Sequence, residues 1–429
     1  MIKRLYNIFS ENNFSYSTDT RTLVLGDIFF ALSGDNFNGN TFAQVAIEKG
    51  ASHVVVDDVE FYTENDERYI KVDSVYDTLL ALACYHRQQF SIPIITIAGS
   101  NGKTTTKEIA YAVLSTQYNV LATSNNNNNN LGVAHTLLAI RPDHELILIE
   151  LGSNTPGELG QAIVLAQPTH GLVTNIGKEH LEFFGSIEGV IEEECQLYTY
   201  LAKNNGIILA PDNDSHIKNF LKENKIIVNK WYGSALSLKN QNILYLVLEW
   251  RGVEIPTHLF GKHNQQNIAA TIALSEMFDI TQKNIINAIE NYIPTNIRSQ
   301  ILEKRNTTFI LDFYNANPSS MQLALESFNH IETTKKKIII LGDMLEMGQH
   351  AKAEHETILK QVLNMNIADA FFSGPYFGEL SSHYHHFENV DDLVHTLRDY
   401  DFNNTLVLIK SSKGILYVHE GFREWLDTY

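Results

Sequence analysis

A short segment of small and charged residues, Gly99 to Thr105, has the composition of a phosphate-binding loop. The apolar, β-branched residues 94–98 before it predict a strand, and residues 107–114 after it follow a helical pattern. A strand, a glycine turn and a helix N-terminus together direct backbone N–H groups and the positive end of a helix dipole toward an anion. In such a loop Lys103 would reach the β- and γ-phosphates of a nucleotide, and the Thr104 hydroxyl would bind Mg²⁺.

The loop is shorter than the usual phosphate-loop pattern, which needs a glycine five residues before Gly102, where this chain has Ile97. A glycine turn with an exposed lysine is therefore an alternative. We favour phosphate binding because a strand precedes the turn and a helix follows it.

The loop sequence Gly-Ser-Asn-Gly-Lys-Thr-Thr closely resembles the ATP loop of the Mur ligases and folylpolyglutamate synthases, which are ATP-dependent amide ligases. The resemblance implies that ATP is a substrate. It assigns ATP binding to Gly99, Ser100, Asn101, Gly102, Lys103, Thr104 and Thr105.

The composition is that of a soluble globular protein with two or three domains, because 429 residues are too many for one core. A formal net charge of -18 argues against nonspecific binding to nucleic acid or to an anionic membrane. Two cysteines suit a reducing cytoplasm, and we find neither a signal peptide nor an apolar stretch that could insert into a membrane. We expect a cytoplasmic monomer.

The first domain is predicted to span residues 1–92 and to contain a β-α-β unit, with strands at 27–32 and 53–56 and a helix at 42–49. Just before it, hydroxyl groups beside Arg21 could hold a phosphate or a uracil, although an ordinary Asx-type turn explains them equally well. The segment resembles the nucleotide-sugar domain of the Mur ligases, with a mild departure at residues 37–40. The resemblance assigns UDP-sugar binding to Thr18, Asp19, Thr20, Arg21, Ser33 and Gly34.

The second domain is predicted to span residues 93–294. A buried-strand pattern ends at Glu150, where a carboxylate could bind Mg²⁺ or could simply be exposed. Another strand precedes His180, and a lone histidine is more often structural. Glu150-Leu151-Gly152 and the residues around His180 resemble two Mur ligase motifs, which imply two Mg²⁺ ions and make Glu150 and His180 metal ligands.

Six consecutive asparagines, residues 125–130, could be a low-complexity linker. They also resemble an asparagine-rich loop that contacts substrate in some Mur ligases. On that resemblance we predict a substrate loop that uses Asn126, Asn128 and Asn129.

A Gly-x-His-Asn-x-x-Asn motif begins at Gly261, ahead of an alanine-rich helix. Amides and a histidine at a helix start could contact a purine or ribose, or could simply cap the helix. The motif resembles the ATP-contacting motif of the same family. The resemblance adds His263, Asn264 and Asn267 to the ATP-binding residues.

Glu194 stands where the family usually has a lysine whose carbamate helps to hold the second Mg²⁺. A glutamate has the same charge and the same hard oxygen ligands without needing CO₂, so we predict that Glu194 is a metal ligand together with Thr104, Glu150 and His180. The alternative is that residues 192–194 form a solvated helix face and that the enzyme is weakened or inactive.

The third domain is predicted to span residues 295–429. Strands at 309–312, 338–341 and 405–410 alternate with helical patterns and predict a Rossmann-like domain without a dinucleotide fingerprint. The preceding hinge contains Arg298, which could pair with the γ-phosphate and bind ATP.

Two motifs in this domain resemble the Mur ligase branch that adds D-alanyl-D-alanine to UDP-N-acetylmuramoyl-tripeptide. They are Asp-x-Tyr-Asn-Ala-Asn-Pro and Leu-Gly-Asp-Met-Leu-Glu-Met-Gly. On this resemblance Asn315 and Asn317 bind D-alanyl-D-alanine. The last motif departs slightly, with Lys413 where an arginine is usual. The predicted catalytic residues are Lys103, His180, Arg298 and Asp312.

The sequence therefore predicts an α/β protein of three domains: a nucleotide-sugar domain, a central ATPase-like domain and a Rossmann-like domain. The resemblance implies an acid–D-amino-acid ligase of peptidoglycan precursor synthesis, which forms an acyl phosphate and then an amide. Another Mur or folylpolyglutamate ligase, or a non-catalytic relative, remains the alternative.

Overall fold

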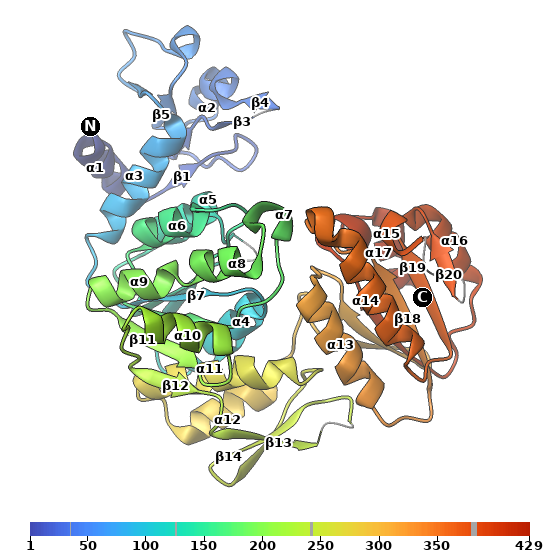
Figure 1. Cartoon of the computed structure of the whole chain (residues 1–429). Coiled ribbons are helices and arrows are strands. Elements are labelled where there is room, and N and C mark those ends of the chain that lie inside the picture. The colour runs from blue at the N-terminus through green and yellow to red at the C-terminus, as the bar shows by residue number, and fades with distance from the viewer. Residues whose placement is uncertain (35, 125–126, 241–242, 379–383) are drawn as a thin grey trace. The chain divides into compact units, whose positions relative to one another are not determined.

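The computed structural model describes residues 1–429 except 35, 125–126, 241–242 and 379–383. It is a mixed α/β protein built on parallel sheets, which confirms the predicted fold class (Figure 1). The chain forms two compact units. Unit 1 comprises residues 1–95, 119–151 and 161–168, and unit 2 comprises residues 96–118, 152–160 and 169–429.

The N-terminal part of unit 1 contains a four-stranded parallel sheet in the order β1-β2-β5-β6. The predicted β-α-β unit is confirmed, because β2 pairs in parallel with β5 and α2 lies between them in the chain. A core of Phe29, Ala46, Val54 and neighbouring side chains joins α2 to the sheet. The elements are α1 Ile2–Glu11, β1 Tyr16–Ser17, β2 Ile28–Phe30, β3 Ser33–Gly34, β4 Phe37–Asn38, η1 Gly39–Phe42, α2 Ala43–Glu48, β5 His53–Val56, η2 Val59–Phe61, β6 Tyr69–Lys71 and α3 Val75–Arg87.

The central sheet has six strands in the order β12-β11-β10-β7-β9-β8. Its strands are β7 Ile94–Ala98, β8 Val120–Ala122, β9 Leu146–Glu150, β10 His170–Val173, β11 Ile207–Pro211 and β12 Lys230–Tyr232. Its helices are α4 Lys103–Leu114, α5 Asn130–Leu138, α6 Glu158–Ala166, α7 Leu181–Phe184, α8 Ile187–Glu194, α9 Gln196–Lys203 and α10 Ser215–Glu223. A three-stranded antiparallel sheet and two helices follow, namely β13 Leu236–Asn240, β14 Val247–Trp250, β15 Val253–Pro256, α11 His263–Met277 and α12 Gln282–Asn291.

The C-terminal sheet, also in unit 2, has the order β16-β17-β21-β18-β19-β20, and only the edge strand β16 is antiparallel. Its strands are β16 Gln300–Lys304, β17 Thr307–Asp312, β18 Lys336–Gly342, β19 Asp369–Ser373, β20 His385–Phe387 and β21 Thr405–Lys410. Its helices are α13 Pro318–His330, η3 Gly348–His350, α14 Ala351–Leu363, α15 Pro375–Gly378, α16 Val390–Asp399, η4 Lys413–Tyr417 and α17 Glu420–Thr428.

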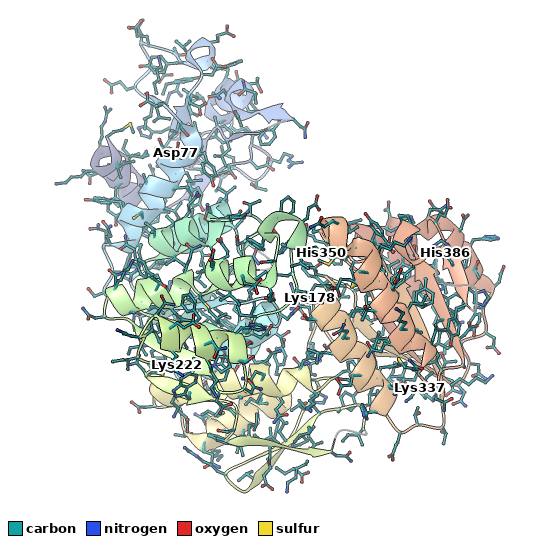
Figure 2. All side chains as sticks on the ribbon, in the orientation of Figure 1. Asp77, Lys178, Lys222, Lys337, His350 and His386 are labelled. Carbon is teal, nitrogen blue, oxygen red and sulfur yellow. The ribbon has the colours of Figure 1, made fainter. Side chains whose placement is uncertain are left out.

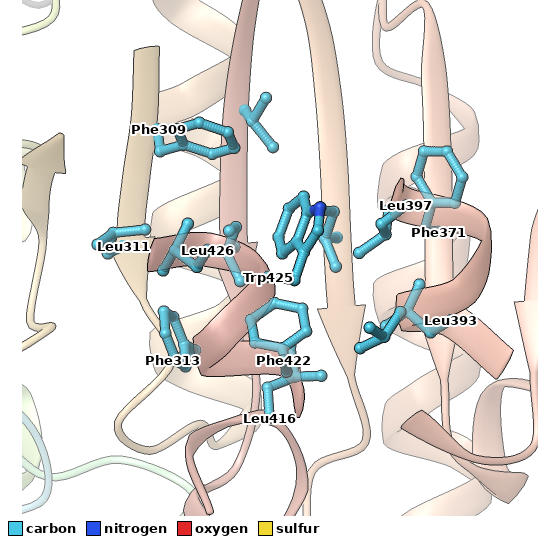
Figure 3. Packing of buried hydrophobic residues seen from close by; sticks show 14 of the residues in the cluster. Phe309, Leu311, Phe313, Phe371, Leu393, Leu397, Leu416, Phe422, Trp425 and Leu426 are labelled. Atoms are coloured by element: carbon cyan, nitrogen blue, oxygen red, sulfur yellow. The ribbon is translucent and has the colours of Figure 1, made fainter. Parts of the chain in front are cut away.

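Aromatic side chains fill the core between the C-terminal sheet and helices α16 and α17 (Figure 3). Trp425 packs edge-on against Phe309, with ring centroids 6.1 Å apart, and both are buried. Burial of a large aromatic side chain contributes about 2–3 kcal/mol, so this core stabilises strand β17, which leads into residues 312–317. None of the helices in the described part of the chain is both long and apolar enough to cross a membrane.

The helix after the phosphate loop begins at Lys103, four residues earlier than its sequence pattern predicts. The sequence pattern misses the first turn of this helix because residues 104–106 are threonines, and β-branched residues have low helix propensity. They are nevertheless buried against the rest of unit 2, and this packing overrides the propensity. The phosphate loop therefore leads directly into a helix N-terminus.

Candidate active site

The phosphate loop turns through two glycines with left-handed backbone, Gly99 at φ +116° and Gly102 at φ +80°. A Cβ at Gly99 would lie 2.3 Å from Thr174 Oγ1, and one at Gly102 would lie 2.2 Å from Asn267 Oδ1. No other residue fits either position. The loop is thus packed tightly between the end of β10 and the helix α11.

The segment after β10 holds the loop through reciprocal hydrogen bonds. Asn101 N donates to Asn175 Oδ1 at 3.2 Å, and Asn175 Nδ2 donates back to Asn101 O at 2.8 Å. Thr174 Oγ1 also donates to Asn101 O at 2.7 Å, and Gly177 N donates to Ser100 Oγ at 2.8 Å. The Thr-Asn-Ile-Gly motif therefore fixes the shape of the phosphate loop.

Lys103 is folded back onto its own loop. Its Nζ donates to Gly99 O and lies 3.8 Å from Glu179 Oε2. Both side chains are largely buried, at 15% and 7% exposure. Glu179 is thus a counter-ion of Lys103 to which the sequence analysis gave no role.

Glu194 lies at the base of the phosphate loop. Its Oε2 accepts a hydrogen bond from Gly99 N at 2.5 Å, and the residue is 2% exposed. Burial raises the pKa of Glu194 to about 8. The charge of Lys103 and the hydrogen bond from Gly99 oppose this rise, and the charges of Glu179 and Glu193 add to it. Glu193 is also buried and accepts hydrogen bonds from Ser153, Gly157 and Leu159. The alternative of a solvated helix face is therefore wrong for these two residues, and only Glu192 is exposed.

His180 follows β10 and caps helix α7 in left-handed backbone at φ 45°. Its Nδ1 lies 2.5 Å from Glu346 Oε2, a residue between β18 and η3. Burial alone would lower the pKa of His180, but the hydrogen bond to Glu346 and the charge of Glu179 raise it above its usual value.

The predicted ATP-contacting motif lies at the start of α11 and contacts the first turn of α4, just after the phosphate loop. Thr106 Oγ1 donates to Asn267 Oδ1 at 3.3 Å, and Asn267 Nδ2 donates to Asn264 Oδ1 at 2.8 Å. Burial lowers the pKa of His263 to about 4, so this histidine is neutral at pH 7. Asn264 and Asn267 are buried, and their amides connect α11 to α4.

Arg298 stacks on an aromatic ring, with its guanidinium carbon 4.1 Å from the centroid of Tyr314. The next residue, Ser299, donates its N–H to Asp312 Oδ1 at 3.1 Å. Asp312 also accepts from the buried Lys410 Nζ at 2.6 Å, across neighbouring strands β17 and β21. Asp312 thus connects the hinge that carries Arg298 to the C-terminal sheet.

The two asparagines predicted to bind D-alanyl-D-alanine differ in their surroundings. Asn315 is exposed, and its side chain accepts from the neighbouring Ala316 N. Asn317 is buried and caps α13, where its Oδ1 accepts from Ser320 N. Asn317 Nδ2 donates to Asn101 Oδ1 of the phosphate loop at 2.8 Å. One of the two asparagines therefore already contacts the ATP loop.

Within unit 1, Asp19 and Arg21 form an exposed pair at 2.6 Å, and this pairing lowers the pKa of Asp19 to about 2. Thr18 and Thr20 flank Asp19, and Ser33 Oγ donates to Asn38 Oδ1 in the β3–β4 hairpin that also contains Gly34. The UDP-sugar candidates thus lie in the segment after β1 and in the β3–β4 hairpin of unit 1.

Two side chains of the asparagine run make hydrogen bonds at the end of β9 and the start of α5. Asn128 Nδ2 donates to Glu150 Oε1 at 2.9 Å, and Asn129 caps α5 by accepting from Gly132 N. Asn126 lies outside the described residues. The loop therefore contacts a predicted metal ligand through Asn128.

Among the residues that the structure describes, no group of three or more His, Cys, Asp or Glu side chains is placed to form a metal cage by itself. Mg²⁺ in phosphoryl-transfer sites is usually held by one or two carboxylates, substrate phosphates and water, so such a cage is not required. The buried residues Thr104, Glu150 and Glu194, which we predict to bind metal, carry hard oxygen donors in a hydroxyl and two carboxyl groups. Their chemistry fits this ion.

Comparison with known proteins identifies the family. The chain matches the family described as Mur ligase middle domain over residues 97–275, and the one described as Mur ligase, glutamate ligase domain over residues 297–413. It is 30% identical over 420 residues to the UDP-N-acetylmuramoyl-tripeptide–D-alanyl-D-alanine ligase of Rickettsia prowazekii, covering 92% of this chain and 92% of that protein. The corresponding ligase of Escherichia coli is 32% identical over 362 residues, covering 79% and 76%.

A solved structure has the same fold. MurF ligase from Thermotoga maritima in complex with ADP superposes with a TM-score of 0.83 at 24% identity, covering 96% of this chain and 98% of that one. The resemblance inferred from the motifs is therefore confirmed. The chain belongs to the Mur ligase family, in its branch of UDP-N-acetylmuramoyl-tripeptide–D-alanyl-D-alanine ligases.

Proposed function

We propose that this enzyme uses ATP to join D-alanyl-D-alanine to UDP-N-acetylmuramoyl-tripeptide, a step in peptidoglycan precursor synthesis. The observation that carries the proposal is the hydrogen bond from Asn317 to Asn101. It brings the Asp-x-Tyr-Asn-Ala-Asn-Pro motif of the C-terminal sheet onto the phosphate loop. A dipeptide bound by that motif and a phosphoryl group bound by that loop would then be near one another.

The chemistry has two steps. A carboxylate oxygen of the tripeptide attacks the γ-phosphorus of ATP, the bond to ADP breaks, and an acyl phosphate forms. The amine of D-alanyl-D-alanine then attacks the acyl carbon, phosphate leaves, and the amine loses a proton as the amide forms. Phosphoryl transfer needs positioning and charge neutralisation more than covalent help from the protein.

We assign these tasks to the following residues. Lys103 leaves Gly99 O to neutralise the β- and γ-phosphates, and Arg298 neutralises charge on the transferring group. Mg²⁺ would polarise the phosphoryl oxygens. Two such ions would be held by Thr104, Glu150, His180 and Glu194.

The remaining assignments complete the proposal. The domains at residues 1–92, 93–294 and 295–429 would bind UDP-sugar, ATP and dipeptide, respectively. We propose a monomer in the cytoplasm, a location that the two free cysteines support.

A phosphate-release assay with UDP-N-acetylmuramoyl-tripeptide, ATP, Mg²⁺ and D-alanyl-D-alanine tests the function. We expect turnover with the dipeptide and none with single amino acids in its place. Turnover with a single amino acid alone would assign the chain to another ligase specificity, and no turnover with either would favour a non-catalytic relative.

A further inference from the structure

Glu346 contacts the predicted metal ligand His180 from a different sheet of unit 2. Its Oε2 lies 2.5 Å from His180 Nδ1, and its backbone oxygen accepts from Glu182 N at 3.1 Å. His180 follows the central strand β10, whereas Glu346 follows β18 of the C-terminal sheet. One residue therefore holds both the side chain of His180 and the backbone two residues further on.

Both residues of this contact have an unusual backbone conformation. His180 and Glu346 both have left-handed backbone, at φ 45° and φ 62°, which is unfavourable for residues other than glycine. Gly348 has φ +51°, and a Cβ there would lie 3.2 Å from Glu182 Cα. The loop after β10 and the loop after β18 thus approach one another through left-handed backbone at His180, Glu346 and Gly348.

The Glu346 loop is anchored from within its own sheet. Asp343 accepts hydrogen bonds from Tyr376 N and Phe377 N, and Met344 N donates to the fully buried His355 Nε2 at 2.9 Å. Ser412 Oγ accepts from Leu345 N at 2.9 Å. Glu346 is therefore presented by a loop whose preceding residues are fixed.

A metal-binding histidine commonly donates its second ring N–H to a carboxylate, which sets the tautomer and the ring orientation. With Nδ1 paired to Glu346 at 2.5 Å, Nε2 is the nitrogen left to accept a metal ion. We propose that Glu346 is a positioning residue that orients His180 for Mg²⁺ and makes metal binding depend on contact between the central and C-terminal sheets. This inference rests on the proposed metal role of His180.

A second ion pair, between the segment after β10 and helix α14, supplies a matched control. Lys178 Nζ donates to Glu354 Oε1 at 2.6 Å, and Lys178 is labelled in Figure 2. Glu354 lies on α14 and contacts Lys178, two residues before His180 in the sequence. Glu354→Gln therefore weakens the contact of the Lys178 segment with α14 without removing the partner of His180.

Mn²⁺ binding in the presence of ADP, measured by electron paramagnetic resonance, tests the inference without relying on turnover. We expect Glu346→Ala to weaken Mn²⁺ binding by about 10–100-fold, as loss of such a partner typically does. Glu346→Gln, which retains an oxygen acceptor but not the charge, should weaken it less. Glu354→Gln should leave it within about twofold of the wild type.

Three outcomes are distinguishable. If His180→Ala itself leaves Mn²⁺ binding unchanged, the metal role of His180 in the proposed function fails. If His180→Ala weakens binding but Glu346→Ala does not, the positioning role is overturned. Equal losses for Glu346→Ala and Glu354→Gln would also overturn it, because the effect would then come from loop contact alone. Thermal unfolding of each variant confirms that it is folded.

Discussion

Glu194 Oε2 accepts a hydrogen bond from the Gly99 N–H, the first amide of the phosphate loop, at 2.5 Å. The residue is fully enclosed, with Lys103 and Glu179 as its charged neighbours. In related ligases a carbamylated lysine would stand at this position. The glutamate therefore contacts the ATP loop directly, in addition to the metal role that we predict from its charge.

Glu194→Ala should lose activity and need more Mg²⁺, and the wild-type enzyme should be insensitive to bicarbonate. The variant leaves the Gly99 N–H without its acceptor, which costs about 1–3 kcal/mol, and removes a metal ligand. Glu194→Gln separates the two roles because it keeps an acceptor but cannot ionise to a carboxylate that binds metal. We expect ADP affinity without Mg²⁺ to survive in Glu194→Gln and the Mg²⁺ requirement to rise. Normal turnover of Glu194→Ala at low Mg²⁺ would exclude the metal role.

Lys103→Ala should abolish turnover while the protein remains folded. The Lys103 ammonium is the phosphate-loop cation, and loss of one such group typically costs at least about 10²–10³-fold in rate. Its contacts include Gly99 O and Glu179, which are polar groups rather than core side chains, so we expect the fold to survive its removal. Phosphate release and circular dichroism of the variant measure the two effects. An unfolded variant, or one with near-normal turnover, would contradict the assignment.

Much of the fold was predictable because apolar runs and glycine turns are local signals. The predicted strand at 405–410 has the bounds of β21, and the strand–glycine–lysine pattern correctly placed the phosphate loop before a helix. The contact between His180 and Glu346 was not predictable, because it joins residues far apart in the sequence. Glu346 lies inside a motif that identified the family, yet its spacing alone does not reveal which side chain it meets.

The contact between Asn317 and Asn101 is a second one that the sequence did not predict, and it changes the role we expect for Asn317. The motif predicts that Asn315 and Asn317 both bind the dipeptide. The bond from Asn317 to Asn101, together with its capping of α13, connects it to the ATP loop as well. Sequence spacing could not separate two asparagines that lie two positions apart.

Asn317→Ala should therefore raise KM for both ATP and D-alanyl-D-alanine, and loss of the helix cap should destabilise the protein by about 1 kcal/mol. Asn315→Ala is the matched control. Its side chain is exposed and contacts its neighbour's backbone, so we expect a higher KM for the dipeptide alone. Steady-state kinetics with each substrate varied in turn measure both constants. An unchanged KM for ATP in Asn317→Ala would remove the proposed link to the phosphate loop.

Replacing Asp19 and Arg21 together with alanine should raise KM for the nucleotide sugar by roughly 10–100-fold, the loss expected for charge-assisted hydrogen bonds. The pair is exposed in unit 1, where Asp19 orients the Arg21 guanidinium through Nε and Nη2. KM for ATP should change little because the phosphate loop belongs to unit 2. Equal changes in both constants would contradict the assignment of the nucleotide sugar to this domain.

The last prediction concerns His86, a buried histidine of α3 in unit 1. It is 0% exposed, its Nε2 lies 3.0 Å from Ile140 O, and the rings of Phe9, Phe14 and Phe90 surround it. Burial lowers the pKa of His86 to about 4 from its usual 6.5. Between about pH 6.5 and pH 4, His86 is protonated in the unfolded chain but neutral in the folded chain. The free energy of unfolding therefore falls as the pH falls through this range. The full loss is about 3 kcal/mol and is complete below about pH 4.

His86→Leu should remove this part of the pH dependence, since leucine does not titrate and fits an apolar site. Urea unfolding followed by far-ultraviolet circular dichroism at pH 7.5, 5.5 and 4.5 measures it in the wild type and the variant. His395→Gln, at an exposed position of α16, is the control and should keep the wild-type slope. If His86→Leu and the wild type lose the same stability between pH 7.5 and pH 4.5, His86 is not the group that unfolding protonates.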